Sequence, residues 1–380
     1  MSEIYLDNAA TTRVIDDAVA VAAAVMRESY GNPSSAHTMG REAKRILDKA
    51  RLQIATVIGA DPSEIVFTSG GTESNNWALL CGADSNRRNG RHIISSAAEH
   101  DAVLKALERL EEIGFSVTRL RPNRAGGVNI EDVEEVLRPD TAVISLMLVN
   151  NETGAITDIA AISRMLRERG SGALLHTDAV QALLKIPVNT AELGVDLMSL
   201  SAHKIHGIKG IGALYIRRGV HIPPLLLGGG QESGLRSGTE SLPLIAAFGE
   251  AAHLGFAEMP ETLERMRSIR LHAIERLCEE NPELVINGVP ECSAPHVLSI
   301  SMPGHRSEVL MNFLESHEIY VSKSSACKRG ARSHVLTAMG ISPRIIDGAL
   351  RVSLSRYTTV EDIDAFCDAI REARERLIRA

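Results

Sequence analysis

The stretch Ala142-Val143-Ile144-Ser145-Leu146-Met147-Leu148, with the residues that follow it, decides the fold. This apolar run predicts a buried strand. Residues 159–169 predict an amphipathic helix, and residues 173–176 predict the next strand. A strand, a helix and another strand in succession are typical of a parallel sheet with helices on its faces. The stretch therefore predicts an α/β fold.

The same alternation extends outward, from Glu64 to about Ile216. Further strands are expected at 65–67, 91–95, 115–120, 197–200 and 213–216, with helices at 72–86, 101–113 and 131–137. After Gly228-Gly229-Gly230 the pattern changes, with helices expected at 242–256, 261–280, 307–317 and 360–377 and strands at 297–301 and 350–354. We therefore expect a large α/β domain over residues 15–257. A smaller α+β domain is expected from residues 1–14 and 258–380, which include Cys327.

Length and composition support this division and exclude several classes of protein. The chain has 380 residues, whereas single cores stop growing at about 250–300 residues. A net charge of −7 argues against nucleic-acid binding and against anionic membranes. The N-terminus lacks the basic and apolar regions of a signal peptide, and no apolar run approaches the roughly 18 residues of a transmembrane helix. We expect a cytoplasmic protein with no nucleic-acid or membrane partner.

The cysteines indicate reduced thiols rather than a disulfide framework or a metal site. The five cysteines stand at positions 81, 278, 292, 327 and 367, and no pair has the spacing CxxC. An odd, scattered set argues against disulfides and against a zinc site, and it fits a cytosol. Four of the five are expected to be structural, because free cysteine behaves as a small apolar residue.

Cys327 differs from the other cysteines in its surroundings. It lies in a small, polar and basic stretch, Ser322 to His334, which predicts a surface loop. The cations in this stretch are Lys323, Lys328, Arg329 and Arg332. Nearby cations stabilise thiolate, which is the nucleophilic form of cysteine and the form that sulfur transfer requires. The sequence therefore marks Cys327 as a candidate nucleophile.

A lysine stands directly after a predicted strand. Residues 195–201 are followed by Ala202-His203-Lys204. Open α/β sheets bind ligands outside the carboxyl ends of their strands, and a lysine amine there can form a Schiff base with pyridoxal 5'-phosphate (PLP). A surface lysine would give the same local pattern, so Lys204 alone leaves both interpretations open.

Three further features follow other strands of the same sheet. Residues 68–74, Thr-Ser-Gly-Gly-Thr-Glu-Ser, join a strand to a helix start and suit a phosphate, although a capped helix start would look similar. Asp178 could keep a pyridine nitrogen protonated, or it could cap a helix. His100 could stack on a ring and relay protons, or it could be an ordinary loop histidine. Together with Lys204, these features favour a cofactor site.

A series of motifs runs through nearly the whole chain. They are 5–12 (YLDNAATT), 31–35 (GNPSS), 68–75 (TSGGTESN), 99–100 (EH), 149–152 (VNNE), 178–181 (DAVQ), 201–204 (SAHK), 236–239 (RSGT), 325–327 (SAC) and 351–356 (RVSLSR). In content and order this series resembles the cysteine desulfurases (NifS/IscS-like, class V aminotransferase family). The resemblance implies an aspartate aminotransferase-like PLP-dependent transferase of fold type I, with a mainly parallel seven-stranded sheet. It also implies removal of sulfur from L-cysteine, giving L-alanine and a persulfide on Cys327.

The resemblance also implies roles for individual residues around the cofactor ring. Lys204 matches the Schiff-base lysine, and Cys327 matches the persulfide nucleophile. His100 matches the ring-stacking acid/base. Asp178 matches the partner of the pyridine nitrogen, and Gln181 matches the residue on the ring oxygen.

Other matching residues are implied to hold the phosphate and the substrate. The remaining cofactor-binding residues are Gly71, Thr72, Asn151, Ser201 and His203. Thr239 would reach the phosphate from a second subunit, which implies a homodimer with shared sites. Asn151 and Arg356 match the grip on the substrate carboxylate, which suits arginine because it donates two parallel hydrogen bonds. A surface salt bridge is the alternative for Arg356.

Two departures from the family pattern leave the partner open. Residues 232–234 are Glu-Ser-Gly where family members often have Glu-Arg-Gly, and the stretch after Cys327 lacks their Glu-Pro before Ser333. The sulfur acceptor could be an iron–sulfur scaffold, a tRNA thiolation protein or another thiol carrier. The alternatives to a desulfurase are a selenocysteine lyase, another class V PLP aminotransferase, and a catalytically weak scaffold for iron–sulfur assembly.

Overall fold

A seven-stranded sheet forms the centre of the larger part of the molecule. The computed structural model describes residues 3–323 and 332–378. The strands are β2 (Ile65–Thr68), β3 (His92–Ser96), β4 (Ser116–Leu120), β5 (Thr141–Ser145), β6 (Leu174–Asp178), β7 (Leu197–Ser201) and β8 (Gly212–Ile216), in the order β2-β8-β7-β6-β5-β3-β4. The run from β4 to β7 is parallel, and β8 is antiparallel to both β7 and β2. The predicted mainly parallel sheet is confirmed.

The sheet strands are apolar because helices cover both faces. All residues of β3, β5, β7 and β8 are buried. Side chains of neighbouring residues point to opposite faces. Ile93 accordingly packs in a cluster with α3 (Gly71–Ser85) and α4 (Asp101–Glu112), whereas Ile94 packs in the cluster that includes α2 (Thr38–Ile58) and α8 (Leu242–Ala257).

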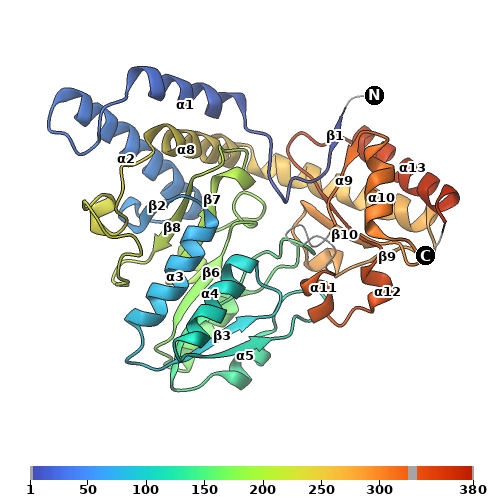
Figure 1. Ribbon diagram of the computed structural model, residues 1–380, viewed down its shortest axis with the longest axis horizontal. Helices are drawn as coiled ribbons and strands as arrows, with labels where there is room; N and C mark the ends of the chain where they lie inside the picture. Colours follow the sequence, from blue (N-terminus) through green and yellow to red (C-terminus); the bar gives the residue numbers. More distant parts are fainter. Residues whose placement is uncertain (1–2, 324–331, 379–380) are drawn as a thin grey trace.

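The remaining helices of this part flank the sheet. They are α1 (Asp16–Glu28), α5 (Ile130–Val136), α6 (Ile159–Glu168) and α7 (Thr190–Leu193). Helices α1 and α2 both pack on α8 (Figure 1).

The predicted strand 142–148 is too long, because β5 ends at Ser145. Residues 146–148 are buried outside the ladder, and a buried apolar run gives the same sequence signal whether or not it is a strand.

The smaller part combines both ends of the chain. Its strands are β1 (Ile4–Tyr5), β9 (Val285–Ile286), β10 (Val297–Ser301), β11 (Ile319–Tyr320) and β12 (Ala349–Ser353), and its helices are α9 (Met259–Glu280), α10 (Ser307–Glu315), α11 (His334–Ala338), α12 (Pro343–Ile346) and α13 (Val360–Arg376). Strands β12-β10-β9 form an antiparallel sheet, and β1 pairs in parallel with β11. In Figure 1 the blue N-terminal strand accordingly lies among orange and red elements.

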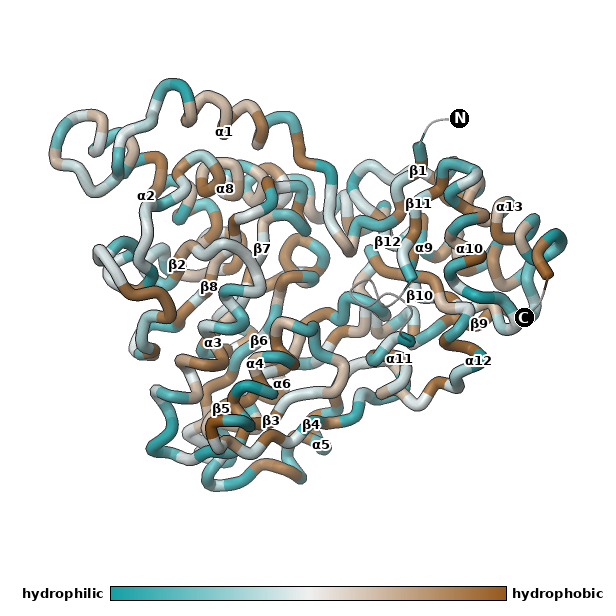
Figure 2. The backbone as a smooth tube through the Cα atoms, viewed as in Figure 1, coloured by the Kyte–Doolittle hydropathy of each residue, from teal (hydrophilic) through white to brown (hydrophobic). Residues whose placement is uncertain are grey.

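Two large apolar clusters match this arrangement. One contains sheet residues such as Ile144 and Met198, and the other contains Leu6 with C-terminal residues such as Phe366. Figure 2 shows brown hydrophobic stretches in both halves of the molecule, bordered by teal segments. Among residues 3–323 and 332–378, no helix combines the length and apolar content needed to cross a membrane.

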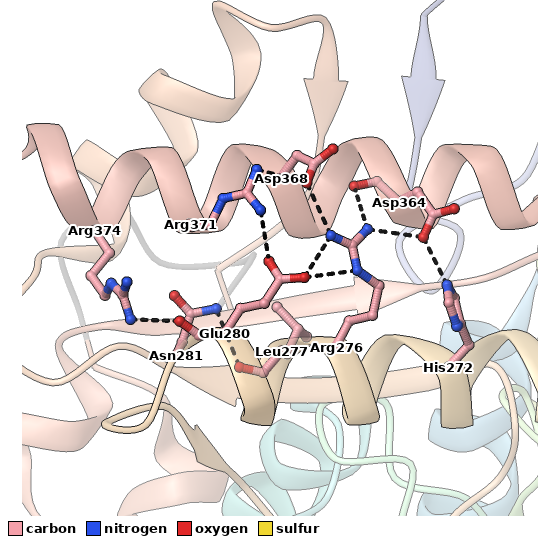
Figure 3. A network of polar contacts seen from close by, with 9 residues as sticks. All are labelled: His272, Arg276, Leu277, Glu280, Asn281, Asp364, Asp368, Arg371 and Arg374. Carbon is pink, nitrogen blue, oxygen red and sulfur yellow. Dashed lines mark hydrogen bonds and ion pairs between the residues drawn. The ribbon is translucent and has the colours of Figure 1, made fainter.

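Polar contacts between α9 and α13 supplement the apolar packing of the smaller part (Figure 3). Arg276 donates from Nε to Glu280 at 2.9 Å and from Nη1 and Nη2 to Asp364 at 2.9 Å and Asp368 at 3.0 Å. These hydrogen bonds raise the pKa of the Arg276 guanidinium above its usual value. A network of several partners fixes two helices in register more firmly than an isolated exposed pair, which contributes at most about 1 kcal/mol.

Candidate active site

A cavity of about 430 Å³ lies beyond the carboxyl ends of the central strands. β6 ends at Asp178 and β7 ends at Ser201, and both terminal residues line the cavity. The lining is Ala9, Ala10, Gly71, Thr72, Asn75, His100, Asp101, Met147, Asn151, Glu152, Asp178, Val180, Gln181, Ser201, His203, Lys204, Arg332, His334 and Arg351. Parallel strands end at one edge of the sheet, so residues far apart in sequence meet there.

The N-terminal segment forms one wall of the cavity, next to Lys204. The Lys204 Nζ donates to the carbonyls of Ala9 and Ala10, both at 2.6 Å. The backbone N–H of Thr12 donates to the carbonyl of His203 at 3.0 Å, and that of Ala9 donates to Ser353 Oγ at 2.8 Å. The motif at residues 5–12 thus has a structural reason, which is to join the lysine segment to β12.

Asp178 presents a carboxylate that two neighbours hold in place. Its Oδ2 accepts from Asn75 Nδ2 at 2.6 Å, and its Oδ1 accepts from the backbone N–H of Val180 at 2.9 Å. Asp178 is buried, and each carboxylate oxygen retains acceptor capacity beyond these bonds. Asn75 lies in the quoted motif 68–75, but sequence reasoning assigned it no role.

The start of α3 offers backbone donors to the cavity. Its N-cap is Gly70, with a φ of 152° and no side-chain cap hydrogen bond. A Cβ at Gly71 would lie 2.6 Å from Val180 Cγ2, so only glycine fits against this side chain. Thr72 and Ser201 line the same cavity. Uncapped N–H groups with adjacent hydroxyls suit a phosphate.

Three histidines line the cavity, and two of them, His100 and His203, follow strands of the large sheet. His100 caps α4, where its Nδ1 accepts from the N–H of Ala102 at 3.1 Å. In the neutral ring the proton therefore resides on Nε2. At His203, burial and then the charges of Lys204 and Lys209 lower the pKa to about 4, so this ring is neutral at neutral pH. The neutral His203 ring offers an N–H without a fixed charge.

Two buried glutamates flank the site, and sequence reasoning gave neither a role. Burial raises the pKa of Glu99 to about 8, although Oε1 accepts from the Met147 N–H at 3.1 Å and from a serine hydroxyl. Burial likewise raises the pKa of Glu152 to about 7, against hydrogen bonding from Ser333 and the charge of Arg351. Both positions belong to quoted motifs, which is the only sequence signal that could have pointed to them.

Most of the predicted cofactor residues come together in this cavity. Those that line it are Gly71, Thr72, His100, Asn151, Asp178, Gln181, Ser201, His203 and Lys204. Gln181 donates from Nε2 to the carbonyl of Ala9 at 2.8 Å, and its Oε1 lies 3.2 Å from His296 Nε2. Cys327 lies outside the described residues, and Thr239 is exposed and does not line the cavity.

Arg356, predicted to hold the substrate carboxylate, also does not line the cavity. It forms an ion pair with Glu258, and its guanidinium lies 5.8 Å from the ring centroid of Tyr357. This matches the salt-bridge alternative. Two arginines line the cavity. Arg332 donates from Nε to Asp347 at 2.6 Å, and Arg351 donates from Nη1 to the carbonyl of Asn151 at 3.0 Å. Sequence reasoning quoted Arg351 in a motif but gave it no role.

Comparison with known proteins assigns the chain to a family. The family described as aminotransferase class-V matches residues 4–366. The cysteine desulfurase IscS of Dictyoglomus turgidum is 41% identical over 377 residues, covering 99% of this chain and 95% of the relative. The chain belongs to the cysteine desulfurases of the class V aminotransferase family.

Solved structures of desulfurase-like proteins agree with this assignment. A NifS-like protein superposes with a TM-score of 0.93 at 41% identity, covering 99% of this chain and 100% of the other. A structure of SspA in complex with cysteine superposes with a TM-score of 0.82 at 34% identity, covering 94% and 100%.

Desulfurases of this family use PLP, and the cavity residues fit that cofactor. The uncapped α3 start, Thr72 and Ser201 would hold the phosphate, and Asp178 would face the ring nitrogen. No side chain caps the N-terminus of α3, so its backbone N–H groups remain donors for the phosphate. Lys204 supplies the amine that a pyridoxal aldehyde requires.

Proposed function

We propose that this chain is a cysteine desulfurase that converts L-cysteine to L-alanine and retains the sulfur as a persulfide on Cys327. The observation that carries the proposal is the convergence of Lys204, Asp178 and His100 on one cavity. An amine, an anchored carboxylate and an imidazole N–H are the groups that PLP chemistry at an amino acid needs. Cys327, which stands in the sequence among Lys323, Lys328, Arg329 and Arg332, supplies the nucleophile.

The chain's own residues divide the work. Bound PLP supplies an electron sink for negative charge at the substrate Cα. Asp178 remains an acceptor toward the ring nitrogen, because Asn75 and the Val180 N–H hold its carboxylate in place. Lys204 Nζ takes the Cα proton, and the Nε2–H of His100 donates to a developing negative charge.

The sulfur-transfer step balances without an outside oxidant. The Cys327 thiolate attacks the substrate sulfur, so an S–S bond forms while the C–S bond of the substrate breaks. The carbon retains the electron pair and takes up protons, which yields alanine. The thiol becomes a persulfide, which a later acceptor thiol can attack.

We propose that Asn151 and Arg351 hold the substrate carboxylate. Both line the cavity, and the Nη1 of Arg351 donates to the Asn151 carbonyl. In the described part of the chain, the buried Nε–H of Arg351 has no hydrogen-bond partner. Its Nη2 donates to Asp7 Oδ1 at 2.9 Å, so Nε is the donor that remains for a substrate carboxylate. Arg356 remains the alternative, although its partner here is Glu258.

The assembly and the setting are part of the proposal. We expect a cytoplasmic homodimer, in which the exposed Thr239 reaches the phosphate of the partner's cofactor. Two observations support this: Thr239 is exposed, and it does not line the cavity of its own chain. We expect the domains 15–257 and 1–14 with 258–380, supported by the two apolar clusters, and a sulfur acceptor such as an iron–sulfur scaffold.

Two substitutions test the proposed function. Cys327→Ser should abolish alanine release from cysteine while leaving the absorbance of bound PLP intact. Lys204→Ala should lose the absorption band near about 400–430 nm that the lysine-linked cofactor gives. Full turnover by Cys327→Ser would show that the reaction does not need the Cys327 thiol. That result would favour a selenocysteine lyase or an aminotransferase instead. Alanine and sulfide should be measured with and without candidate acceptor proteins.

A further inference from the structure

The chain that follows Cys327 returns to the described structure at an anchored point. Ser333 caps α11, where its Oγ accepts from the N–H of Leu336 at 3.0 Å. The same hydroxyl donates to Glu152 Oε2 in the cavity wall. The next residue, His334, places Nε2 2.9 Å from the carbonyl of Glu99. Consecutive residues thus attach the start of α11 to two segments of the active site.

A buried glutamate such as Glu152 is a costly way to anchor a helix if the contact serves stability alone. Glu152 is only 2% exposed, and its carboxylate accepts a hydrogen bond from Ser333 Oγ. Arg351 of β12 and Asp101 of α4 are the charged groups that act on it, with opposite effects on its pKa. A buried carboxyl costs desolvation free energy, and apolar residues of similar volume often stabilise a core better.

The covalent chain makes this anchor matter for the thiol. Ser333 is six residues after Cys327. An extended chain spans at most about 3.6 Å per residue, so the thiol can move no farther than roughly 22 Å from wherever Ser333 is held, plus its own side chain. Moving the anchor therefore moves the whole volume that the sulfur can reach.

We propose that Glu152 is a positioning residue for sulfur transfer, which holds Ser333 so that Cys327 reaches the substrate sulfur in the cavity. This inference rests on the proposed function and deepens it. Glu152 acts through Ser333 and the chain, so it should affect the step that needs the thiol more than the binding of cofactor or cysteine.

The test separates these steps in the PLP-loaded enzyme. Cysteine binding is followed by the change in cofactor absorbance, and sulfur removal by single-turnover alanine formation. Glu152→Ala should leave the binding response intact and slow alanine formation about 10-fold or more, the equivalent of a lost hydrogen bond to a buried carboxyl. Glu152→Gln keeps an oxygen that accepts from Ser333 and should stay within about 5-fold of wild type, the equivalent of a net hydrogen bond.

Two further variants keep the test decisive. Ser333→Ala removes the contact from the other side and should also slow alanine formation selectively, which covers the case in which Glu152→Ala does not fold. Thr337→Val is the matched control, because it deletes a hydrogen bond to the Ser333 carbonyl on the exposed side of the same helix and should leave the rate unchanged.

Two results would overturn the inference. One is a Glu152→Ala enzyme that forms alanine at the wild-type rate. The other is a variant whose cysteine-binding response falls in step with its rate, which would make Glu152 a structural support of the cavity. A wild-type enzyme that forms no alanine from cysteine would instead overturn the proposed function, so the two failures are distinguishable.

Discussion

Glu99 should make the stability of the protein fall as pH rises. Glu99 is 1% exposed, and burial raises the pKa of its carboxyl to about 8 from an ordinary value of 4.5. Between these values the folded state keeps a proton that the unfolded state releases. The stabilisation is fully present below about pH 4.5 and is lost as pH rises through about 8.

The substitution Glu99→Gln isolates this effect because an amide does not titrate. Its oxygen can still accept from the Met147 N–H and from Ser96, which both bond Oε1. The opposite oxygen, Oε2, is buried and has no hydrogen-bond partner in the described part of the chain, so an amide nitrogen there loses no existing contact. The variant should therefore keep the fold.

The magnitude follows from the difference between the two pKa values. One pKa unit corresponds to about 1.4 kcal/mol, and integrating the proton release between pH 5.5 and pH 8.0 gives a loss of about 3 kcal/mol in the wild type. Glu99→Gln should lack this loss. Urea unfolding of both PLP-loaded proteins at the two pH values measures it. An equal difference between wild type and variant at both pH values would refute the buried-acid reasoning.

Two other predictions concern substrate and phosphate binding. Arg351→Lys should raise the KM for cysteine about 10-fold or more, since lysine cannot donate two parallel hydrogen bonds to a carboxylate. Arg356→Lys should be measured alongside it. If only Arg356→Lys raised the KM, Arg356 would be the residue that holds the substrate carboxylate. Gly71→Ala should cost about 1–3 kcal/mol and weaken PLP binding, because its Cβ would lie 2.6 Å from Val180. Gly82→Ala in the same helix meets nothing closer than 3.5 Å and should leave PLP affinity unchanged and raise thermal stability slightly.

The sequence predicted the sheet well because its strands are buried on both faces. Apart from His92, the runs that became β3, β5 and β7 contain only apolar or small residues, and helix-length amphipathic segments separate them. The site followed from the same logic, since residues directly after parallel strands must share one edge. The prediction of Asp178 and Lys204 as cavity residues needed only that edge and the types of side chain.

Features that depend on distant pairing could not be predicted in this way. The pairing of β1 with β11 joins short segments more than 300 residues apart, such as Ile4 with Ile319. Whether Arg351 or Arg356 reaches the cavity depends on where β12 ends, and Arg351 lies within that strand whereas Arg356 lies beyond it. The buried state of Glu99 runs against the usual exposure of glutamate.

The wall beside Lys204 has a consequence for how the active enzyme is assembled. That wall consists of residues near the start of the chain, and Ala9 is joined in turn to Ser353 near its other end. A ribosome must therefore release almost all of the chain before Ala9 gains its contact with Ser353, and the wall beside Lys204 is complete only then. Acquisition of the vitamin should come late in biosynthesis, and colour in a nascent or C-terminally shortened product should be weak even where the central sheet has already folded.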